Sequence, residues 1–242
     1  MSGEFHPSAH AASAPDRLAV VVPSPGETRT YAELEANSNR IAAMLRSRGL
    51  GRGDVVAVVM PNDVTWYEIV WGVQRCGMYL VPVNWHLTAK GASYIVADCG
   101  AKALFAGAAL ADTIARFGDA ASNVGLRISV GGELPGFEPL EAAVDGQPDT
   151  ASPDDVEGSW MFYSSGTTGQ PKGIKPGLPT IELGEMNPLV GLISGLYGIT
   201  PDSVYLSPAP LYHAAPAGWS TTVHRIGGTV VVMDRFDPLE WM

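Results

Sequence analysis

Hydrophobic and polar residues recur along the chain with two periods, one typical of amphipathic helices and one typical of buried strands. Residues 30–49 place apolar side chains at helical spacing, Thr30 and Glu33 form a capping box at the start, and Gly49 is suited to a left-handed end. The unbroken apolar run Val55–Met60 follows, and a short run of this kind is typical of a strand buried on both faces. The pattern therefore predicts a helix followed by a buried strand.

The alternation of helical and strand-like segments continues along the chain. Further helices are predicted near residues 64–76, 89–98, 108–117, 185–197 and 219–225. Further strands are predicted near residues 79–83, 103–106, 126–130, 160–164, 204–207 and 229–233. Pro82 lacks a backbone N–H, so we expect its strand to lie at a sheet edge or to carry a bulge. Strands that alternate with helices predict an α/β fold of layered, mainly parallel sheets with flanking helices.

One segment interrupts this alternation. Residues 131–158 contain four prolines, many acidic residues and little periodicity. We interpret them as a surface connection between a first α/β layer, residues 1–130, and a second layer, residues 159–242, that carries the glycine-rich segment described below.

Composition and charge limit the classes of function that this chain can have. The chain has 242 residues, of which 46% are hydrophobic and 17% charged, so a packed core is expected and disorder is not. A net charge of −10 argues against nucleic-acid binding, which needs a basic face. Cys76 and Cys99 are too few for a disulfide scaffold or a cysteine-rich metal site, so we expect buried, reduced thiols. The chain shows neither a signal-peptide pattern nor an apolar run long enough to span a membrane, so we expect a cytoplasmic protein.

The segment after the strand near residues 160–164 has the composition of a phosphate-binding loop. Glycines permit backbone N–H groups to turn toward an anion, hydroxyls add donors, and a lysine adds positive charge. The residues concerned are Ser164, Ser165, Gly166, Thr167, Thr168, Gly169 and Lys172. The spacing fits neither the Walker A motif nor the dinucleotide GxGxxG motif. Most clusters rich in Ser, Thr and Gly are solvated loops, but the preceding strand and the ordered Pro-Lys-Gly end favour a phosphate cradle here.

Residues 163–173, YSSGTTGQPKG, resemble the phosphate-binding signature of the adenylate-forming, or AMP-binding, enzymes, which include acyl-CoA synthetases, luciferases and peptide-synthetase adenylation domains. Four further segments resemble the same family: residues 30–34, 53–62, 76–84 and 208–213. The sequence as a whole is most similar to those of bacterial fatty-acid or medium-chain acid–CoA ligases. The resemblance implies the N-terminal part of the ATP- and acyl-binding domain.

The resemblance also implies a two-step reaction. A carboxylic acid attacks the α-phosphate of Mg²⁺–ATP to give an acyl-adenylate and pyrophosphate, and the thiol of coenzyme A then displaces AMP. By resemblance, Thr168 and Lys172 are catalytic, the rest of the cradle binds ATP, and Tyr212 and His213 border the acyl pocket. No residue is predicted as a metal ligand.

Several alternatives stay open on the sequence. A lone histidine such as His213 is often a packing residue, and the other four histidines are assigned no role. The aromatic residues Trp66, Tyr67 and Trp71 fall at helical spacing and are predicted to be core. An amino-acid-activating adenylation domain is less favoured, because such domains carry an aspartate where this chain has Ala214–Ala217.

The family's later motifs cannot be placed in this chain. These motifs bind adenine, Mg²⁺ and ribose and supply the hinge and lid residues. We therefore expect the isolated chain to be a catalytically silent nucleotide-binding or interaction fragment. We also expect an open sheet edge that favours a homo-oligomer.

Overall fold

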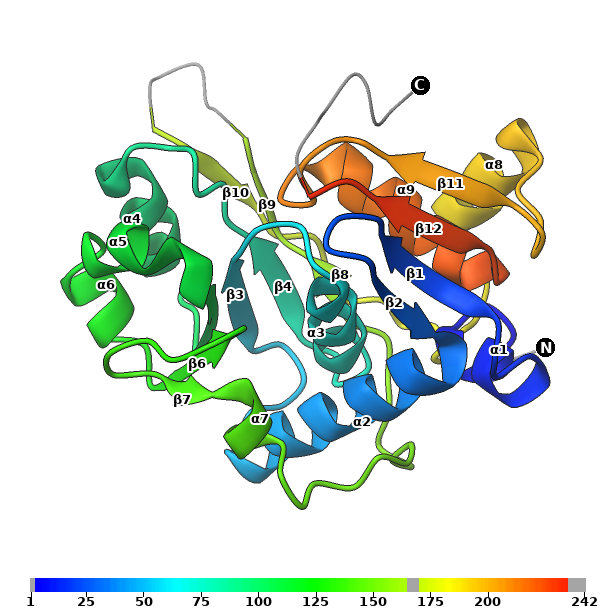
Figure 1. Cartoon of the computed structure of the whole chain (residues 1–242), viewed down its shortest axis with the longest axis horizontal. Coiled ribbons are helices and arrows are strands. Elements are labelled where there is room, and N and C mark those ends of the chain that lie inside the picture. Colours follow the sequence, from blue (N-terminus) through cyan, green and yellow to red (C-terminus); the bar gives the residue numbers. More distant parts are fainter. Residues whose placement is uncertain (1–2, 165–169, 235–242) are drawn as a thin grey trace.

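Two larger β-sheets and one two-stranded ribbon, with covering helices, make up the computed structural model, which describes residues 3–164 and 170–234 (Figure 1). The larger sheet has the strand order β7-β6-β5-β3-β4-β8, and every neighbouring pair in it is parallel. Its strands are β3 (Val55–Val59), β4 (Tyr79–Pro82), β5 (Ala103–Gly107), β6 (Leu126–Val130), β7 (Glu138–Pro139) and β8 (Ser159–Trp160). The predicted α/β class with mainly parallel sheets is confirmed.

Helices cover both faces of this sheet, which explains the unbroken apolar run in β3. Val56 and Val58 pack into a core shared with α2 (Tyr31–Ser47) and α3 (Val64–Gln74). The alternate residues of β3 face a second core, shared mainly with three helices on the other side. These helices are α4 (Ala89–Asp98), α5 (Ala111–Ala115) and α6 (Asp119–Ser122).

The second sheet joins strands from opposite ends of the sequence, in the order β11-β12-β1-β2. Its strands are β1 (Leu18–Val22), β2 (Glu27–Thr30), β11 (Val204–Ser207) and β12 (Thr229–Val232). The helices α8 (Pro188–Tyr197) and α9 (Ala214–Ile226) accompany it, and α1 (Pro7–Ser13) packs against α2. Strand pairing therefore crosses the proposed segments 1–130 and 159–242, whose division into domains remains a prediction.

The predicted start and end of α2 are confirmed. The Thr30 hydroxyl accepts a hydrogen bond from the Glu33 N–H at 3.2 Å, and the Glu33 carboxylate accepts one from the Thr30 N–H at 2.8 Å. Gly49, just beyond the helix, has a φ of +81°, a conformation that side chains with a Cβ rarely adopt. The signals that begin and end this helix are thus encoded in its own residues and the residue next to it.

The prediction that Pro82 marks a sheet edge is wrong, because β4 lies between β3 and β8. The Tyr79 N–H donates to the carbonyl of Asp54, just before β3, and the Val83 N–H donates to Val58 in β3. Because backbone groups alternate in direction along a strand, those of Pro82 turn toward β8. On that side the pairing with β8 ends at Trp160 opposite Leu80. Pro82 therefore lies beyond the last hydrogen bond between β4 and β8, so the lack of a proline N–H removes no hydrogen bond from the sheet.

Two other segments differ from expectation. The helix predicted at residues 108–117 is a 3₁₀ turn, Ala108–Leu110, followed by the short helix α5. Residues 131–158 form more than a surface connection, because they contain β7 and α7 (Leu140–Ala143) and end in buried ion pairs. The Glu157 carboxylate, 3% exposed, accepts two hydrogen bonds of 2.9 Å from the Arg225 guanidinium.

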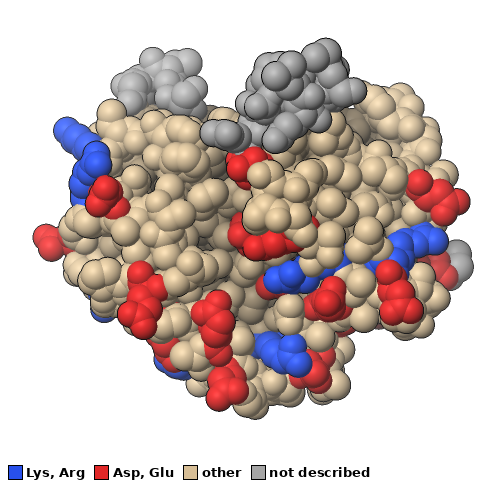
Figure 2. Space-filling model, in the orientation of Figure 1, with Lys and Arg blue, Asp and Glu red and all other residues tan. Residues whose placement is uncertain are grey.

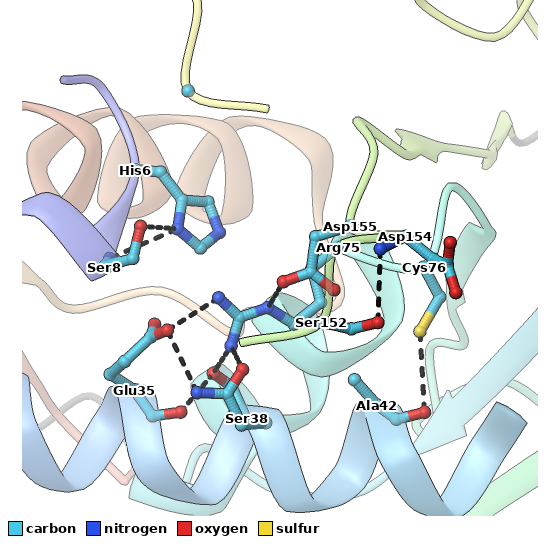
Figure 3. A network of polar contacts seen from close by, with 12 residues as sticks. His6, Ser8, Glu35, Ser38, Ala42, Arg75, Cys76, Ser152, Asp154 and Asp155 are labelled. Carbon is cyan, nitrogen blue, oxygen red and sulfur yellow. Dashed lines mark hydrogen bonds and ion pairs between the residues drawn. The ribbon is translucent and has the colours of Figure 1, made fainter. Parts of the chain in front are cut away.

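A buried arginine joins α2, α3 and the 131–158 segment (Figure 3). The side chain of Arg75, which is fully buried, donates to the Glu35 carboxylate at 2.7 Å and to the Ser38 hydroxyl at 3.1 Å. It also donates to the Asn39 side-chain oxygen, and its Nε lies 3.1 Å from an Asp155 oxygen. Arg75 thus links two helices to a loop that is 80 residues further along the chain.

The two cysteines are free and buried, as predicted. Burial raises the pKa of the Cys76 thiol to about 12 and that of the Cys99 thiol to about 11. Both thiols therefore stay protonated near neutral pH and are poor nucleophiles. Within the part of the chain that the structure describes, every helix is too short or too polar to cross a lipid bilayer.

Candidate functional site

A cavity of about 260 Å³ gathers three distant segments of the chain around residues that the sequence had singled out. It is lined by Pro82, Asn84, Leu87, Ile95, Tyr163, Ser164, Pro171, Tyr212 and His213. Ser164, Tyr212 and His213 are thus brought together, although Ser164 is 48 residues from Tyr212. A larger cavity of about 580 Å³ lies beside Arg52 and residues 179–183, but no predicted site residue lines it. We therefore place the candidate site at the smaller cavity.

The turn after β4 forms one wall of this cavity. Asn84 accepts a hydrogen bond from the His86 N–H at 2.9 Å through its side-chain oxygen, which shapes the turn. Thr88 then caps α4 by accepting a hydrogen bond from the Gly91 N–H at 3.2 Å. The carboxyl end of a parallel strand is where α/β folds usually bind ligands, and the cavity has this location.

An antiparallel ribbon forms the second wall. It consists of β9 (Phe162–Ser164) and β10 (Lys172–Ile174), and Lys172 pairs with Ser164. The expected loop residues Ser165, Gly166, Thr167, Thr168 and Gly169 lie outside the described residues.

The position of Lys172 differs from the expectation that this residue belongs to the phosphate-binding loop. It lies on strand β10, is exposed, and is absent from the residues that line the cavity. A Cβ at the neighbouring Gly173 would approach the Tyr163 ring to 2.9 Å and the end of the Met161 side chain to 2.7 Å, so these side chains would have to shift. The glycine lets β10 lie directly against β9.

The Tyr163 side chain anchors the ribbon to α4. Its hydroxyl donates to one oxygen of Asp98 at 2.7 Å, and the Tyr94 hydroxyl donates to the other at 3.0 Å. Partial burial, and then the hydrogen bond to Asp98, raise the pKa of Tyr163. Tyr163 therefore stays a neutral hydrogen-bond donor, and both oxygens of Asp98 have partners.

Asn62 holds the third wall, residues 208–213, against the end of β3. Its side-chain oxygen accepts a hydrogen bond from the Leu211 N–H at 2.8 Å. Its side-chain N–H₂ donates to the carbonyl oxygens of Ala209 at 3.3 Å and Met233 at 2.7 Å. One amide thus fixes both the 208–213 segment and the end of β12, which places Tyr212 and His213 at the cavity.

Tyr212 connects the third wall to the first. Its hydroxyl lies 2.8 Å from His86 Nδ1, and the His86 ring stacks on Trp85 with centroids 3.6 Å apart. Partial burial raises the pKa of Tyr212. The neutral hydroxyl therefore bridges two segments that are 126 residues apart.

The interpretation of His213 as a packing residue does not agree with the structure. Its side chain is exposed at the first turn of α9, with its ring 4.6 Å from that of Tyr212 in an edge-on arrangement. The packing histidine is instead His224, which accepts from the Trp71 indole N–H at 3.3 Å and donates to the Ala19 carbonyl at 3.0 Å. Trp66, Tyr67 and Trp71 are buried, which confirms that they are core residues.

Sequence reasoning missed three residues that shape this site: Asn62, Asn84 and His86. Asn62 and Asn84 were noted only within segments that resemble the family, and His86 was given no role. A signal was present, since Asn62 and Asn84 each follow closely on a buried strand, where polar side chains reach the carboxyl edge of the sheet.

The described residues do not provide a recognisable site for Mg²⁺. Residues 3–164 and 170–234 contain no group of three or more His, Cys, Asp or Glu side chains arranged to hold a metal ion. Among the described residues, no acidic side chain lines the cavity. We therefore assign no metal ligands and derive no step through a metal ion.

Replacing Asn62 by alanine is expected to lower the free energy of unfolding by about 2 kcal/mol, because three hydrogen bonds are lost and one N–H and two carbonyls lose their partner. Asn62→Asp is the matched variant, since a carboxylate keeps the acceptor for Leu211 but repels the two carbonyls. Urea unfolding monitored by circular dichroism measures the free energy of unfolding of both variants. A parent-like midpoint for Asn62→Ala would show that Asn62 does not hold the segment.

The comparisons with known proteins agree with this architecture. The AMP-binding enzyme family matches residues 8–242. The chain is 32% identical over 239 residues to the fatty acid–[acyl-carrier-protein] ligase ScoC of Streptomyces coeruleorubidus, covering 95% of this chain and 43% of ScoC. It is 34% identical over 215 residues to a feruloyl-CoA synthase of Amycolatopsis sp., covering 88% of this chain and 40% of that synthase.

A solved protein of Rhodopseudomonas palustris, assigned as a long-chain-fatty-acid CoA ligase, matches with a TM-score of 0.85 at 25% identity. The alignment covers 100% of this chain and 59% of that protein. The chain thus spans less than half the length of the two curated relatives named above. The sequence match over residues 8–242 and the shared architecture lead to one conclusion: the chain belongs to the family of AMP-binding enzymes.

Proposed function

We propose that the chain carries the phosphate cradle and part of the acid site of an ATP-dependent acid–thioester ligase. In this reaction a carboxylate attacks the α-phosphate of ATP to form an acyl-adenylate and pyrophosphate, and the thiol of coenzyme A or a carrier protein then displaces AMP. The observation that supports this most is that Ser164, Tyr212 and His213 line the same cavity.

The charge around the cavity suits two anionic substrates. The described residues that line it include no carboxylate. Asp98, which lies behind Tyr163, accepts hydrogen bonds from two tyrosine hydroxyls and so presents a partly compensated charge. No acidic residue occurs between Glu157 and Glu182. A carboxylate and a triphosphate can therefore approach without close like-charge repulsion.

Within this proposal the chain's own residues bind and orient rather than form covalent bonds. The backbone N–H groups and hydroxyls of residues 164–169 would hold the phosphates, and the Lys172 ammonium would offset the charge that develops on the departing pyrophosphate. Tyr212 and His213 would border the acid. His213 has an exposed ring at the first turn of α9, so it can reach a ligand in the cavity.

We propose a fatty or aromatic carboxylic acid as the substrate class. One relative named above acts on a fatty acid and another on a feruloyl group, and an uncharged, partly aromatic wall suits either. An amino-acid substrate is less supported. The Ala214–Ala217 stretch lacks a carboxylate that could hold an ammonium group, and none of the described residues that line the cavity carries one.

The Lys172→Ala variant tests the cradle directly. We expect it to weaken ATP binding by about 5- to 150-fold, or about 1–3 kcal/mol, because a charge-assisted contact to phosphate is lost. Isothermal titration calorimetry with ATP measures the effect. Lys175→Ala is the matched control, since Lys175 lies three residues away but places its ammonium 4.5 Å from the centre of the Tyr79 ring. Equal affinities for Lys172→Ala and the parent would remove Lys172 from the role assigned to it.

A catalytically silent nucleotide-binding module is the second candidate, favoured by the lack of a metal-binding cluster among the described residues. ATP–pyrophosphate exchange in the presence of octanoate or ferulate separates the two. Exchange that depends on the acid supports the ligase, whereas ATP binding without exchange supports the silent module.

A further inference from the structure

Residues 3–13, which contain helix α1 and which we call the N-terminal strap, are held by hydrogen bonds to segments that are distant in sequence. The Phe5 N–H donates to the Gly184 carbonyl at 3.0 Å, and the Phe5 carbonyl accepts a hydrogen bond from the Arg225 guanidinium at 3.1 Å. The His10 ring donates from Nε2 to the Arg225 backbone carbonyl at 2.9 Å. A helix of only seven residues is not stable by itself, so α1 depends on these contacts and on its own cap.

That cap is His6, the buried centre of the strap. Its side chain is 1% exposed, and its ring lies edge-on to Trp71 with the ring centres 5.2 Å apart. His6 Nδ1 accepts a hydrogen bond from the Ser8 N–H at 3.2 Å and lies 2.9 Å from the Ser8 hydroxyl (Figure 3). A ring nitrogen that accepts a hydrogen bond carries no proton, so the neutral ring is protonated on Nε2. Among the described residues Nε2 has no hydrogen-bond partner, so His6 fits this place only as the neutral cap.

The surroundings of His6 oppose a second proton on its ring. Burial is the main cause that lowers the pKa of His6 well below its usual value of 6.5. The nearby charges lower this pKa further: Arg75 at the end of α3, then Arg225 on α9, then His10 one turn along α1. The carboxylates of this region are already paired with the two arginines; they are Glu35, Asp155 and Glu157. An imidazolium at this place would therefore be buried among positive charges without a counter-ion. The surface around this part of the molecule carries both acidic and basic side chains (Figure 2).

We propose that the N-terminal strap is an acid-released clasp, closed while His6 is neutral and open once its ring takes up a second proton. The second proton goes to Nδ1, where it faces the Ser8 N–H, so two donors meet and α1 loses its cap. The charged ring is disfavoured beside Arg75 and Arg225, whereas the open strap places it in water. Opening also breaks the hydrogen bonds of the strap to Gly184 and Arg225.

The direction of the pH response follows from the two protonation states. His6 in the open strap has its ordinary pKa of about 6.5, whereas in the closed strap its pKa lies well below this value. The closed strap is therefore fully favoured above about pH 6.5, and this preference is lost as the pH falls. Below that pH the ratio of open to closed strap rises about tenfold per pH unit until the pKa of the closed state is reached. His10 adds a smaller effect, because burial also lowers its pKa and its hydrogen bond to Arg225 opposes this shift.

Amide hydrogen exchange of the whole chain, resolved by NMR, tests the proposal. The N–H groups of Phe5 and Ala9, which donate to the carbonyls of Gly184 and His6 at 3.0 Å, report opening of the strap. The Val83 N–H, which donates to β3 at 2.9 Å, reports opening of the core. Between pH 6 and pH 5 the protection factors of Phe5 and Ala9 should fall about five- to tenfold and stay below that of Val83. Protection of Phe5 that is independent of pH, or equal to that of Val83 throughout, would overturn the proposal.

Two variants separate His6 from the second histidine of the strap. His6→Asn keeps the cap, because asparagine is a favoured N-cap residue, but its side chain does not titrate in this pH range. The strap of this variant should lose most of the pH dependence. His10→Gln is the matched control, since a glutamine amide can still donate to the Arg225 carbonyl, and it should keep the pH dependence of the parent. A parent-like fall in protection for His6→Asn would show that His6 is not the group that opens the strap.

The tautomer of His6 provides a test that needs no variant. In the parent labelled with ¹⁵N-histidine, NMR at pH 7 should show the neutral His6 ring with its proton on Nε2, because Nδ1 accepts from the Ser8 N–H. A proton on Nδ1 at this pH would contradict the cap on which the proposal rests. The charged form of His6 at pH 7 would contradict it equally, because the closed strap would then already hold an imidazolium.

Discussion

Replacing Arg75 by methionine is expected to lower the free energy of unfolding by about 3–5 kcal/mol, the cost of removing one partner from a buried ionic network. The Arg75 side chain is fully buried, and the carboxylates of Glu35 and Asp155 that it contacts are only 14% and 6% exposed. Without the guanidinium Glu35 loses its ion pair, and Asp155 keeps only its ion pair with Arg46 at 2.7 Å. Urea unfolding at neutral pH, followed by circular dichroism, measures the loss.

Arg48→Met is the matched control for this prediction. Arg48 donates to both oxygens of Glu138 at 2.8 and 2.9 Å, but the two side chains are 42% and 35% exposed. An exposed pair is worth about 0–1 kcal/mol, so the control should unfold nearly like the parent. Adding Glu35→Gln and Asp155→Asn to Arg75→Met should recover part of the loss. Equal losses for the Arg75 and Arg48 variants would contradict a special contribution from burial.

Acidification is expected to remove about 3 kcal/mol of stability through His224 alone. Burial, with a smaller contribution from His10, lowers the pKa of His224 to about 4, and the hydrogen bond to the Ala19 carbonyl opposes this only in part. The unfolded chain binds a proton on this histidine near pH 6.5, whereas the native state does so only near pH 4. The stabilisation is therefore complete above pH 6.5 and is lost as the pH falls through this window, at about 1.4 kcal/mol per pH unit.

The His224→Gln variant isolates this effect, because a glutamine amide can still donate to Ala19 and accept from Trp71 without titrating. The difference in unfolding free energy between parent and variant should shrink by about 3 kcal/mol between pH 7 and pH 4. Burial also lowers the pKa of His6, followed by the nearby Arg75 and Arg225 charges, so the variant should retain some acid sensitivity. Parallel stability curves for parent and variant would show that His224 does not drive the acid response.

Elements built from local signals could be predicted from the sequence. The capping box of Thr30 and Glu33 and the positive φ of Gly49 depend on side chains within a few residues, so helix α2 was correctly expected. The buried strand β3 was expected because an unbroken apolar run requires cover on both faces. The YSSGTTGQPKG segment was sufficient to indicate the AMP-binding family, which the match over residues 8–242 confirms.

Features that depend on two distant segments could not be predicted. Whether Pro82 marks an edge depends on where β8 stops, and β8 lies 77 residues further along the chain. The placement of Lys172 on a strand depends on its pairing with Ser164. It also depends on the close approach of the Tyr163 ring to Gly173, the next residue. The contribution of Asn62 to the site depends on three backbone groups from residues 209, 211 and 233.

The sequence by itself determined the family and the α/β class, because each is encoded in contiguous residues whose types limit what the backbone and side chains can do. Tertiary structure alone decided which residues meet. It brought Ser164, Tyr212 and His213 to one cavity. The physical reason is that contact between residues far apart in sequence depends on strand order and register, and these are set by the packing of the whole core.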